Sequence, residues 1–283
     1  MGIHSATACG LALGAALAGC SLIVSVDDLT SPAATIDDAG STPIVDAAPD
    51  TDADAEVTDA ADAGAVCPEE PPDPSLVLYL PFDDVPSALP PVDCSAKARA
   101  ATTARGDPAA IWTEGKRGGG ADLASTCFRF GDAADLRFDG APFTIAAWVF
   151  VRSYALDSDG RQLAGVTASG HGWRFGSDDP ARFELDLRAP GPEKREIAIP
   201  LELATWTHVA AVYDPANGEA ITYRDGVLAQ RETNTITTFT SDGSTLLLGC
   251  EAGDDGPTFD GVVDELRIYA RPLPATEIAA LAR

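Results

Sequence analysis

Two alternating carboxylates in residues 183–188 are the side chains of this sequence best placed to do chemistry. The segment reads Phe-Glu-Leu-Asp-Leu-Arg. In a strand, Glu184 and Asp186 would share one face, because successive side chains point to opposite faces. A pair of carboxyl groups about 5–5.5 Å apart can hydrolyse a glycosidic bond, one as nucleophile and the other as acid. Arg188 follows on the same face, so what the segment can do depends on the elements that position it.

The sequence contains no other recognisable catalytic pattern. It has three His, and it has no Ser–His–Asp pattern, phosphate-binding loop or metal-binding helix. His208 shares a strand face with Trp206, Ala210 and Val212. We therefore expect a hydrogen-bonded core or boundary histidine at this position and not a catalytic one.

Asp264 is a carboxylate within the apolar segment 262–268. By alternation it would share a face with Val262, Leu266 and Ile268. A carboxylate in such surroundings needs backbone donors or a cation to offset its lost hydration. We expect Asp264 to hold an adjoining loop through backbone hydrogen bonds.

Short strands separated by turns run from about residue 75 to the end of the chain. Besides 183–188, strand-like runs cover residues 76–80, 143–151, 206–213 and 245–248. Asp225-Gly226 is typical of a two-residue hairpin turn. The only segment with a helical pattern is 274–282, in which Ile278 and Leu281 are spaced to meet the core. These features predict an all-β, antiparallel two-sheet sandwich.

Residues 21–74 have a different composition. Between Ser21 and Ser75 the chain has 14 acidic residues and no Lys, Arg or aromatic residue. Such a stretch buries too little apolar surface to offset the entropy of ordering, so we predict a disordered Asp/Ala-rich linker. The formal charge of the whole chain is −25, which argues against a nucleic-acid partner.

The first twenty residues end in Leu17-Ala18-Gly19-Cys20 after a small apolar run. This ending resembles a bacterial lipobox, which implies a signal peptide over residues 1–20 and lipidation of Cys20. The run over 6–18 is shorter than the roughly 20 residues of a spanning helix. We therefore expect an exported protein held to a membrane by a lipid anchor. Ser21 is compatible with sorting to the outer membrane or cell surface of a Gram-negative bacterium.

Four cysteines remain after this processing: Cys67, Cys94, Cys127 and Cys250. An even number of scattered cysteines in an exported domain suggests two disulfides, for which three pairings exist. We favour Cys127 with Cys250, since both lie in strand-like runs, and Cys67 with Cys94 at the start of the domain. The sequence alone does not choose among the three.

Several motifs occur in a familiar order along residues 75–283. They include Leu78-Tyr79-Leu80-Pro81-Phe82-Asp83, Phe143-Thr144-Ile145-Ala146-Ala147-Trp148 and the closing Val263-Asp264-Glu265-Leu266-Arg267-Ile268-Tyr269. Together they resemble the laminin-G-like or concanavalin A-like jelly-roll domain, kin to pentraxins and legume lectins. The resemblance implies two antiparallel sheets, one of them concave, with ligands commonly held on loops at a rim.

The same resemblance bears on catalysis. Related glucanases place Glu, Asp and Glu on alternate residues of one strand that faces the sugar. Glu184 and Asp186 begin this pattern, but Arg188 stands where the second Glu would be, so the acid is missing. We predict that the protein is not an enzyme. A diverged glycoside hydrolase is the alternative.

A calcium site is also implied by the resemblance. The strand that ends in Gly249 is followed by Glu251, Asp254 and Asp255, which resembles the acidic segment that supplies calcium ligands in pentraxins. Calcium prefers six to eight oxygen ligands. A second acidic loop at 157–160 could join the first if folding brings them together. We predict weak Ca²⁺ binding here, with a solvated acidic loop as the alternative.

We expect the ligand site on a rim loop formed by His171, Trp173 and Glu251. Trp173 would stack on a sugar, unless it is a buried strand residue. The predicted protein is a membrane-anchored exported lipoprotein whose domain at 75–283 is a non-enzymatic binding module for glycans or for extracellular or envelope proteins. A structural or adhesive surface protein is the alternative.

Overall fold

Nearly all regular structure in this computed structural model is β-strand. It describes residues 67–69, 72–83, 89–131, 133–154, 160–167, 170–178, 182–191, 193–241, 243–251 and 258–283. These residues belong to one unit that spans residues 58–283. Cys20 and the predicted linker up to residue 66 lie outside the described residues.

The strands and the one α-helix of the described ranges have the following bounds. They are β1 (Leu76–Leu80), β2 (Ala101–Arg105), β3 (Trp112–Glu114), β4 (Gly119–Asp122), β5 (Cys127–Phe130), β6 (Phe143–Val151), β7 (Arg161–Thr167), β8 (Gly172–Asp178), β9 (Arg182–Arg188), β10 (Lys194–Pro200), β11 (Trp206–Asp214), β12 (Glu219–Arg224), β13 (Val227–Thr233), β14 (Leu246–Leu248), β15 (Gly261–Tyr269) and α1 (Ala275–Leu281). Short 3-10 turns cover Pro108–Ala110 and Ala134–Arg137.

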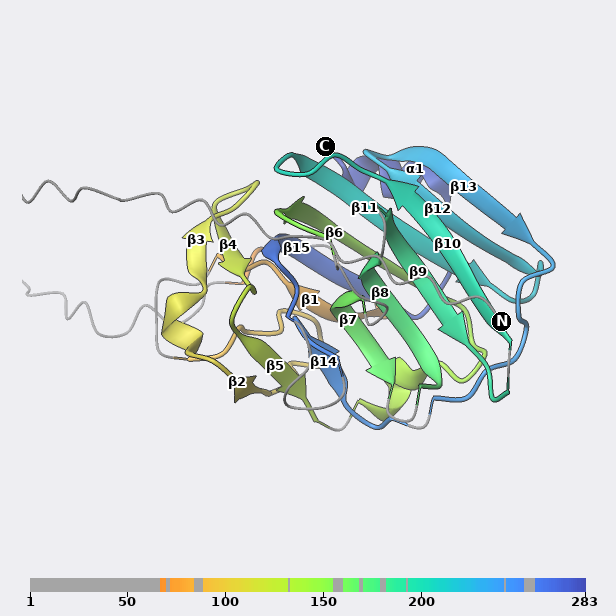
Figure 1. The fold of residues 1–283 in the computed structure, drawn as a ribbon, viewed down its shortest axis with the longest axis horizontal. Helices are drawn as coiled ribbons and strands as arrows, with labels where there is room; N and C mark the ends of the chain where they lie inside the picture. The colour runs from red at the N-terminus through yellow and green to blue at the C-terminus, as the bar shows by residue number, and fades with distance from the viewer. Residues whose placement is uncertain are drawn as a thin grey trace, which may run out of the picture. The chain divides into compact units, whose positions relative to one another are not determined.

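The strands form two antiparallel sheets that stack as layers (Figure 1). Within the described residues, one sheet has eight strands in the order β13-β12-β11-β6-β15-β4-β3, with β1 pairing the remaining length of β15. The other has seven, in the order β10-β9-β8-β7-β14-β5-β2. Neighbouring strands are often far apart in sequence, as in a jelly roll. The predicted all-β two-sheet architecture is confirmed.

The main core lies between the two sheets. Alternate residues of each strand enter it, so Phe183, Leu185 and Leu187 of β9 are fully buried against side chains of the eight-stranded sheet, including Val149 and Val263. Because period-two alternation places every second side chain on one face, the charged residues between them point to the other face. The alternation predicted for residues 183–188 is confirmed.

The pattern of β15 departs from simple alternation. A β-bulge between Asp264 and Arg267 interrupts its pairing with β6, and Glu265 has a left-handed φ of 54°. The extra residue moves Leu266 into the core with Val263 and leaves Asp264 on the outer face. The prediction that Asp264 shares a face with Leu266 was therefore wrong, since alternation cannot be counted across a bulge.

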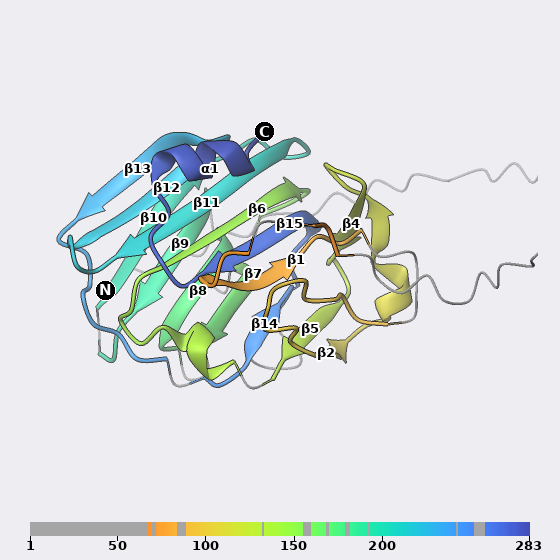
Figure 2. The same cartoon turned by 180° about the vertical axis from the view of Figure 1, so that it is seen from behind.

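A second apolar cluster lies on the outer face of the eight-stranded sheet, where α1 packs (Figure 2). Ile278 of α1 is buried there against residues of β11 and β12 that include Val212 and Ile221. The helix predicted over 274–282 is thus present and contributes Ile278 to this layer. In the part of the chain that the structure describes, no helix has the length and apolar character of a membrane span.

Two disulfides join distant segments. Cys67 is bonded to Cys94, and Cys127 at the start of β5 is bonded to Cys250 just after β14. This is the pairing that the sequence favoured among the three. The second bond cross-links two strands that already pair in the seven-stranded sheet.

Candidate functional site

The outer face of the seven-stranded sheet carries a dense group of charged side chains. Arg174 of β8 pairs in register with Asp186 of β9, and Asp186 pairs in turn with Glu196 of β10. Glu184 lies two residues before Asp186 and so shares its face. Three neighbouring strands therefore bring a guanidinium and three carboxylates together on the face opposite to the core.

Arg174 is the centre of this group. Its Nη2 lies 3.6 Å from Glu184 Oε1 and 3.5 Å from Asp186 Oδ2, and its Nη1 donates to Glu251 Oε1 at 2.7 Å. Arg174, Glu184 and Asp186 are only 3%, 1% and 0% exposed. Buried charges persist only when they are paired, and one guanidinium here offsets several carboxylates. We call these three buried residues, Arg174, Glu184 and Asp186, the charged layer.

The accessible groups lie at one end of β9 and β10. Arg188 Nε donates to Asp186 Oδ2 at 2.7 Å, and Lys194 Nζ lies 3.6 Å from the same oxygen and also pairs with Glu196. The side chains of Arg188, Lys194 and Glu196 are 29%, 38% and 30% exposed. They present both donors and acceptors. Asp186 behind them fixes Arg188 and Lys194, and Lys194 in turn pairs with Glu196.

Gly160 leaves the space that Arg174 occupies. Its φ is +67°, which favours glycine, and a Cβ added there would overlap Nη1 of Arg174. The backbone at Gly160, just before β7, therefore packs directly against the guanidinium of Arg174. Any larger residue at this position would have to displace Arg174.

The carboxylates of this group have the spacing of metal ligands but are already paired with cations. Ligand oxygens of Glu184, Asp186 and Glu196 lie within 4.8 Å of one another, a spacing that could hold an ion. Three cations, Arg174, Arg188 and Lys194, lie within 4 Å of the same carboxylates. These cations would repel a Ca²⁺ ion placed among the same carboxylates.

The structure corrects the predicted role of Trp173. Its side chain is 0% exposed, and its Nε1 donates to the carbonyl oxygen of Leu136 at 2.7 Å inside the core. It therefore cannot stack on a sugar, and the alternative of a buried strand tryptophan holds. Arg174, the next residue, points to the opposite face and is the one that joins the charged group.

The other predicted ligand residues are placed as follows. His171 is half-buried and directly precedes Gly172, which pairs in register with Arg188, so it lies at the same end of the sheet as the accessible groups. Glu251 is engaged by Arg174. Asp254, Asp255 and the acidic loop residues 157–159 lie outside the described residues.

Sequence reasoning missed Arg174, Lys194 and Glu196. Glu196 is the third carboxylate of the group, but it comes from the neighbouring strand and not from position 188. The signal that could have found it is the hairpin between β9 and β10, whose short connection fixes which residues face each other. Arg174 could have been found from the alternation of β8.

A second buried polar group lies on the outer face of the eight-stranded sheet. Asp264 Oδ2 accepts a hydrogen bond from the backbone N–H of Arg117 at 2.8 Å, which holds the loop between β3 and β4, as predicted. Burial raises the pKa of Asp264 to about 7, against the opposing effect of this hydrogen bond. Burial also lowers the pKa of His208 to about 4. His208 is buried, as expected, and its ring lies edge-on to that of Trp148.

Solved structures of similar fold include several binding domains. Domain 4 of AbnA, an extracellular arabinanase from Geobacillus stearothermophilus, solved in complex with arabinotriose, is 21% identical, with a TM-score of 0.57 over 74% of this chain and 98% of that one. The binding domain of Paraclostridial Mosquitocidal Protein 1 is 14% identical, with a TM-score of 0.57 over 74% of this chain and 52% of that one. At these identities the likeness shows the fold alone.

A structure of botulinum neurotoxin type C, from work on cell entry that depends upon interaction with two ganglioside molecules, is also similar. It is 14% identical, with a TM-score of 0.56 over 74% of this chain and 50% of that one. The chain thus spans about half the length of the toxin domains that it matches. No curated protein matches the chain. A laminin-G family model described as the concanavalin A-like lectin/glucanases superfamily matches residues 127–279, and the chain therefore belongs to that superfamily.

Proposed function

We propose that this protein is an exported, lipid-anchored module that binds glycans without catalysis, and that the ligand lies against Arg188, Lys194 and Glu196. The observation that carries the proposal is the charged layer on the outer face of the seven-stranded sheet, where Arg174 pairs with Asp186, Asp186 holds Arg188 and Lys194, and Lys194 pairs with Glu196. Sugar hydroxyls both donate and accept hydrogen bonds, and such bonds are strongest to charged groups.

The solved neighbours support a saccharide as the ligand class. One of them was solved with arabinotriose, and another is a neurotoxin whose cell entry is dependent upon interaction with two ganglioside molecules. Neither likeness identifies a site in this chain, because function depends on side chains placed on a fold and not on the fold itself. The site proposed above rests on the residues of this chain.

The ion pairs of the charged layer argue against hydrolysis. A glycosidase needs two carboxyl groups that face the glycosidic bond. Arg174 lies near both Glu184 and Asp186, and Lys194 pairs with Glu196. Glu184 and Asp186 are also buried, so a sugar would have to displace these cations to reach the carboxylates.

Export and lipid anchoring remain proposals that rest on Leu17-Ala18-Gly19-Cys20. The two disulfides support an oxidising compartment. Metabolic labelling with a palmitate analogue in a Gram-negative host should label the wild-type chain and not Cys20→Ala. Equal labelling of both chains, or of neither, would contradict the anchor.

Calcium binding near Glu251, Asp254 and Asp255 also remains a proposal. Of these, only Glu251 is described, and its Oε1 already accepts from Arg174, so it does not offer that oxygen to an ion. We therefore expect any Ca²⁺ to bind there only weakly. A ligand that binds only the folded state raises its melting temperature. A melting temperature unchanged in millimolar Ca²⁺, with no heat on titration, would refute the site.

Neutral oligosaccharides that include an arabinotriose test the glycan site directly. Glu196→Gln removes one accessible charge. We expect the dissociation constant measured by calorimetry to rise about tenfold, because roughly one charged hydrogen bond is lost. Glu219→Gln is the matched control, since Glu219 is paired with Arg231 on strands of the other sheet. The proposal fails if the two variants bind alike.

The same samples test for turnover. We expect no release of reducing sugar from laminarin or arabinan over hours. Turnover that disappears in Glu184→Gln would support the glycoside hydrolase alternative and overturn the non-enzymatic assignment.

A further inference from the structure

A cationic cavity lies at the opposite edge of the same sheet. It has a volume of about 530 Å³ and is lined by Lys97, Arg99, Ala100, Thr102, Arg129 and Gly131. Of the described residues that line it, three are cationic and none is acidic. Asp135 lies beside the cavity and pairs with both Lys97 and Arg99, so the three cations exceed this carboxylate by two charges. The chain as a whole has 19 basic and 44 acidic residues, so this local excess of positive charge runs against the charge of the chain.

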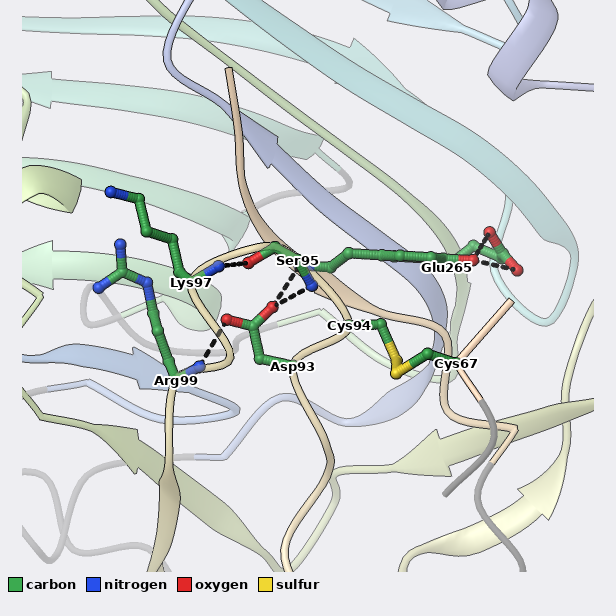
Figure 3. Close-up of a disulfide and its surroundings, with 8 residues drawn as sticks. Cys67, Asp93, Cys94, Ser95, Lys97, Arg99 and Glu265 are labelled. Carbon is green, nitrogen blue, oxygen red and sulfur yellow. Dashed lines mark hydrogen bonds between the residues drawn. A yellow bond between two sulfur atoms is a disulfide. The ribbon is translucent and has the colours of Figure 1, made fainter. Parts of the chain in front are cut away.

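The loop that carries two of these cations is tightly fixed. The buried carboxylate of Asp93 accepts hydrogen bonds from the backbone N–H groups of Tyr79, Ser95 and Arg99, at 3.0, 2.9 and 2.9 Å. The Cys67–Cys94 disulfide lies next to it in the chain. Figure 3 shows the side chains of Lys97 and Arg99 extending to the same side of this loop, away from the disulfide.

The guanidinium of Arg99 is held in one orientation. Its Nε donates to the carbonyl oxygen of Val77 at 3.1 Å, and its Nη2 donates to Asp135 Oδ2 at 2.6 Å. The side chain is only 8% exposed. A guanidinium fixed in this way loses little entropy when a further anion approaches it, and this is the preorganisation that a binding site needs.

Arg129 contributes from the sheet itself. It lies on β5 between Phe128 and Phe130, which are buried in the core, so its side chain is on the outer face. This is the same face as the charged layer around Arg174. From β9 to β5 the order is β9-β8-β7-β14-β5, which is four strand spacings, or roughly 19 Å.

From this arrangement we propose that the cavity binds an anionic sugar unit, one that carries a carboxylate or a sulfate, as a second subsite on the glycan-binding face. Arg and Lys together supply several charged donors, and a guanidinium matches the paired oxygens of either group. The volume falls within the range of small-ligand sites. The inference rests on the proposed glycan-binding function and adds that the natural ligand is an acidic saccharide.

Calorimetry with three tetrasaccharides of one backbone tests the proposal on the full chain. The probes are a uronic-acid tetrasaccharide, its uncharged methyl ester and a sulfated form. We expect at least one charged form to bind about tenfold more tightly than the ester, with an advantage that shrinks as salt rises from 0.05 to 0.5 M. The form that binds more tightly identifies the anionic group. Equal binding of all three would overturn the proposal.

Two variants locate the binding. Lys97→Gln and Arg129→Gln should each weaken binding of the charged saccharide about tenfold and leave the ester unaffected, because one charged contact is lost. Arg231→Gln, an exposed arginine paired with Glu219 on β12, is the control and should bind as the wild type does. Arg99 is not substituted, because it also donates hydrogen bonds to Val77 and Asp135, and their loss would disturb the loop itself. A charged saccharide that binds both cavity variants normally would overturn the assignment.

The outcomes separate this inference from the function on which it rests. If the neutral oligosaccharide binds in a manner that depends on Glu196 and the charged forms bind no better, the second subsite is wrong and the glycan site stands. If inorganic sulfate binds as tightly as the sulfated saccharide, the cavity holds anions without reading a sugar, and the inference also fails. If no saccharide binds, both fail.

Discussion

His208 and Asp264 lie on either side of Trp148, on three neighbouring strands of the eight-stranded sheet, and burial shifts their pKa values in opposite directions. Both residues pair in register with Trp148, His208 from β11 and Asp264 from β15. The pKa of His208 is lowered to about 4 and that of Asp264 is raised to about 7, in each case chiefly by desolvation. Burial disfavours the charged form of both groups, so their contributions to pH dependence oppose each other.

Asp264→Asn should make stability rise with pH between 4 and 7 relative to the wild type. The folded-state pKa of Asp264 is above the unfolded value of 3.8, so its contribution is fully present below pH 3.8 and is lost as pH rises toward 7. Asparagine does not titrate. At about 1.4 kcal/mol per pKa unit, the difference between the two chains should change by roughly 3–4 kcal/mol over this range. Urea unfolding at several pH values measures it.

The comparison depends on the slope and not on the absolute stability. The asparagine amide changes the hydrogen bond to Arg117 by a constant amount, which does not vary with pH. Parallel curves for the two chains would mean that Asp264 titrates in the folded protein as it does in the unfolded one.

His208→Gln should have the opposite effect. The folded-state pKa of His208 is about 4, below the unfolded value of 6.5. Between these two pH values the unfolded chain binds a proton at His208 and the folded chain does not. The wild type therefore loses stability as pH falls from 6.5 toward 4. The glutamine variant lacks this loss, amounting to roughly 3 kcal/mol. The wild type measured in parallel is the control, because the two chains differ only at residue 208. A His208→Gln curve that falls as steeply as the wild type below pH 6.5 would contradict the shift.

Gly160→Ala should disturb the charged layer from behind. The alanine Cβ would overlap Arg174 Nη1, and the left-handed φ of +67° adds backbone strain of about 1 kcal/mol. Gly218 has an almost identical φ of +66°, with nothing within 4 Å of its Cβ position. Gly218→Ala therefore measures the strain alone. We expect Gly160→Ala to be destabilised by about 1–2 kcal/mol more and to bind glycan several-fold more weakly.

Equal behaviour of the two alanine variants would show that Arg174 moves aside without consequence. In that case Arg174 would not be the residue that fixes the accessible groups, and the proposed mechanism of orientation would be wrong.

Local patterns predicted the strands and turns of this fold well. Alternation identified the two faces of β9, and Asp225-Gly226 forms the predicted turn, with positive φ at both residues and Arg224 paired with Val227. These features depend on neighbours in sequence. The bulge at Glu265 was missed because it is defined by pairing with β6, more than a hundred residues away.

The candidate site was predicted less completely, for a related reason. Glu184 and Asp186 were recognised as a pair on one strand face, but their partners Arg174 and Glu196 come from the strands on either side. These three strands follow one another in the chain, so the pairs could have been inferred from the two hairpins, but the register that places Arg174 and Glu196 opposite Asp186 depends on turn lengths that the strand pattern alone does not give. Trp173 was taken for a ligand contact because a tryptophan suits both a core and a sugar site, and only burial separates the two.

The two disulfides should differ in what they contribute to stability. Cys127 and Cys250 are 123 residues apart, and Cys67 and Cys94 are 27 apart. A cross-link stabilises mainly by restricting the unfolded chain, and this effect grows with the logarithm of the loop length. We expect Cys127→Ala with Cys250→Ala to lower the free energy of unfolding by about 1 kcal/mol more than Cys67→Ala with Cys94→Ala. Urea unfolding of the two double variants measures the difference.

Packing should add to that difference, because Cys127 and Cys250 are both buried together with Leu247, so their replacement by alanine also removes core contacts. The wild type under strong reductant provides the control, since it loses both cross-links without changing any side-chain volume beyond the thiol. Non-reducing peptide mapping checks the pairing on the same sample. If the shorter cross-link proved the more stabilising of the two, restriction of the unfolded chain would not be the main effect, and the Cys67–Cys94 bond would instead act by holding the folded loop that carries Lys97 and Arg99.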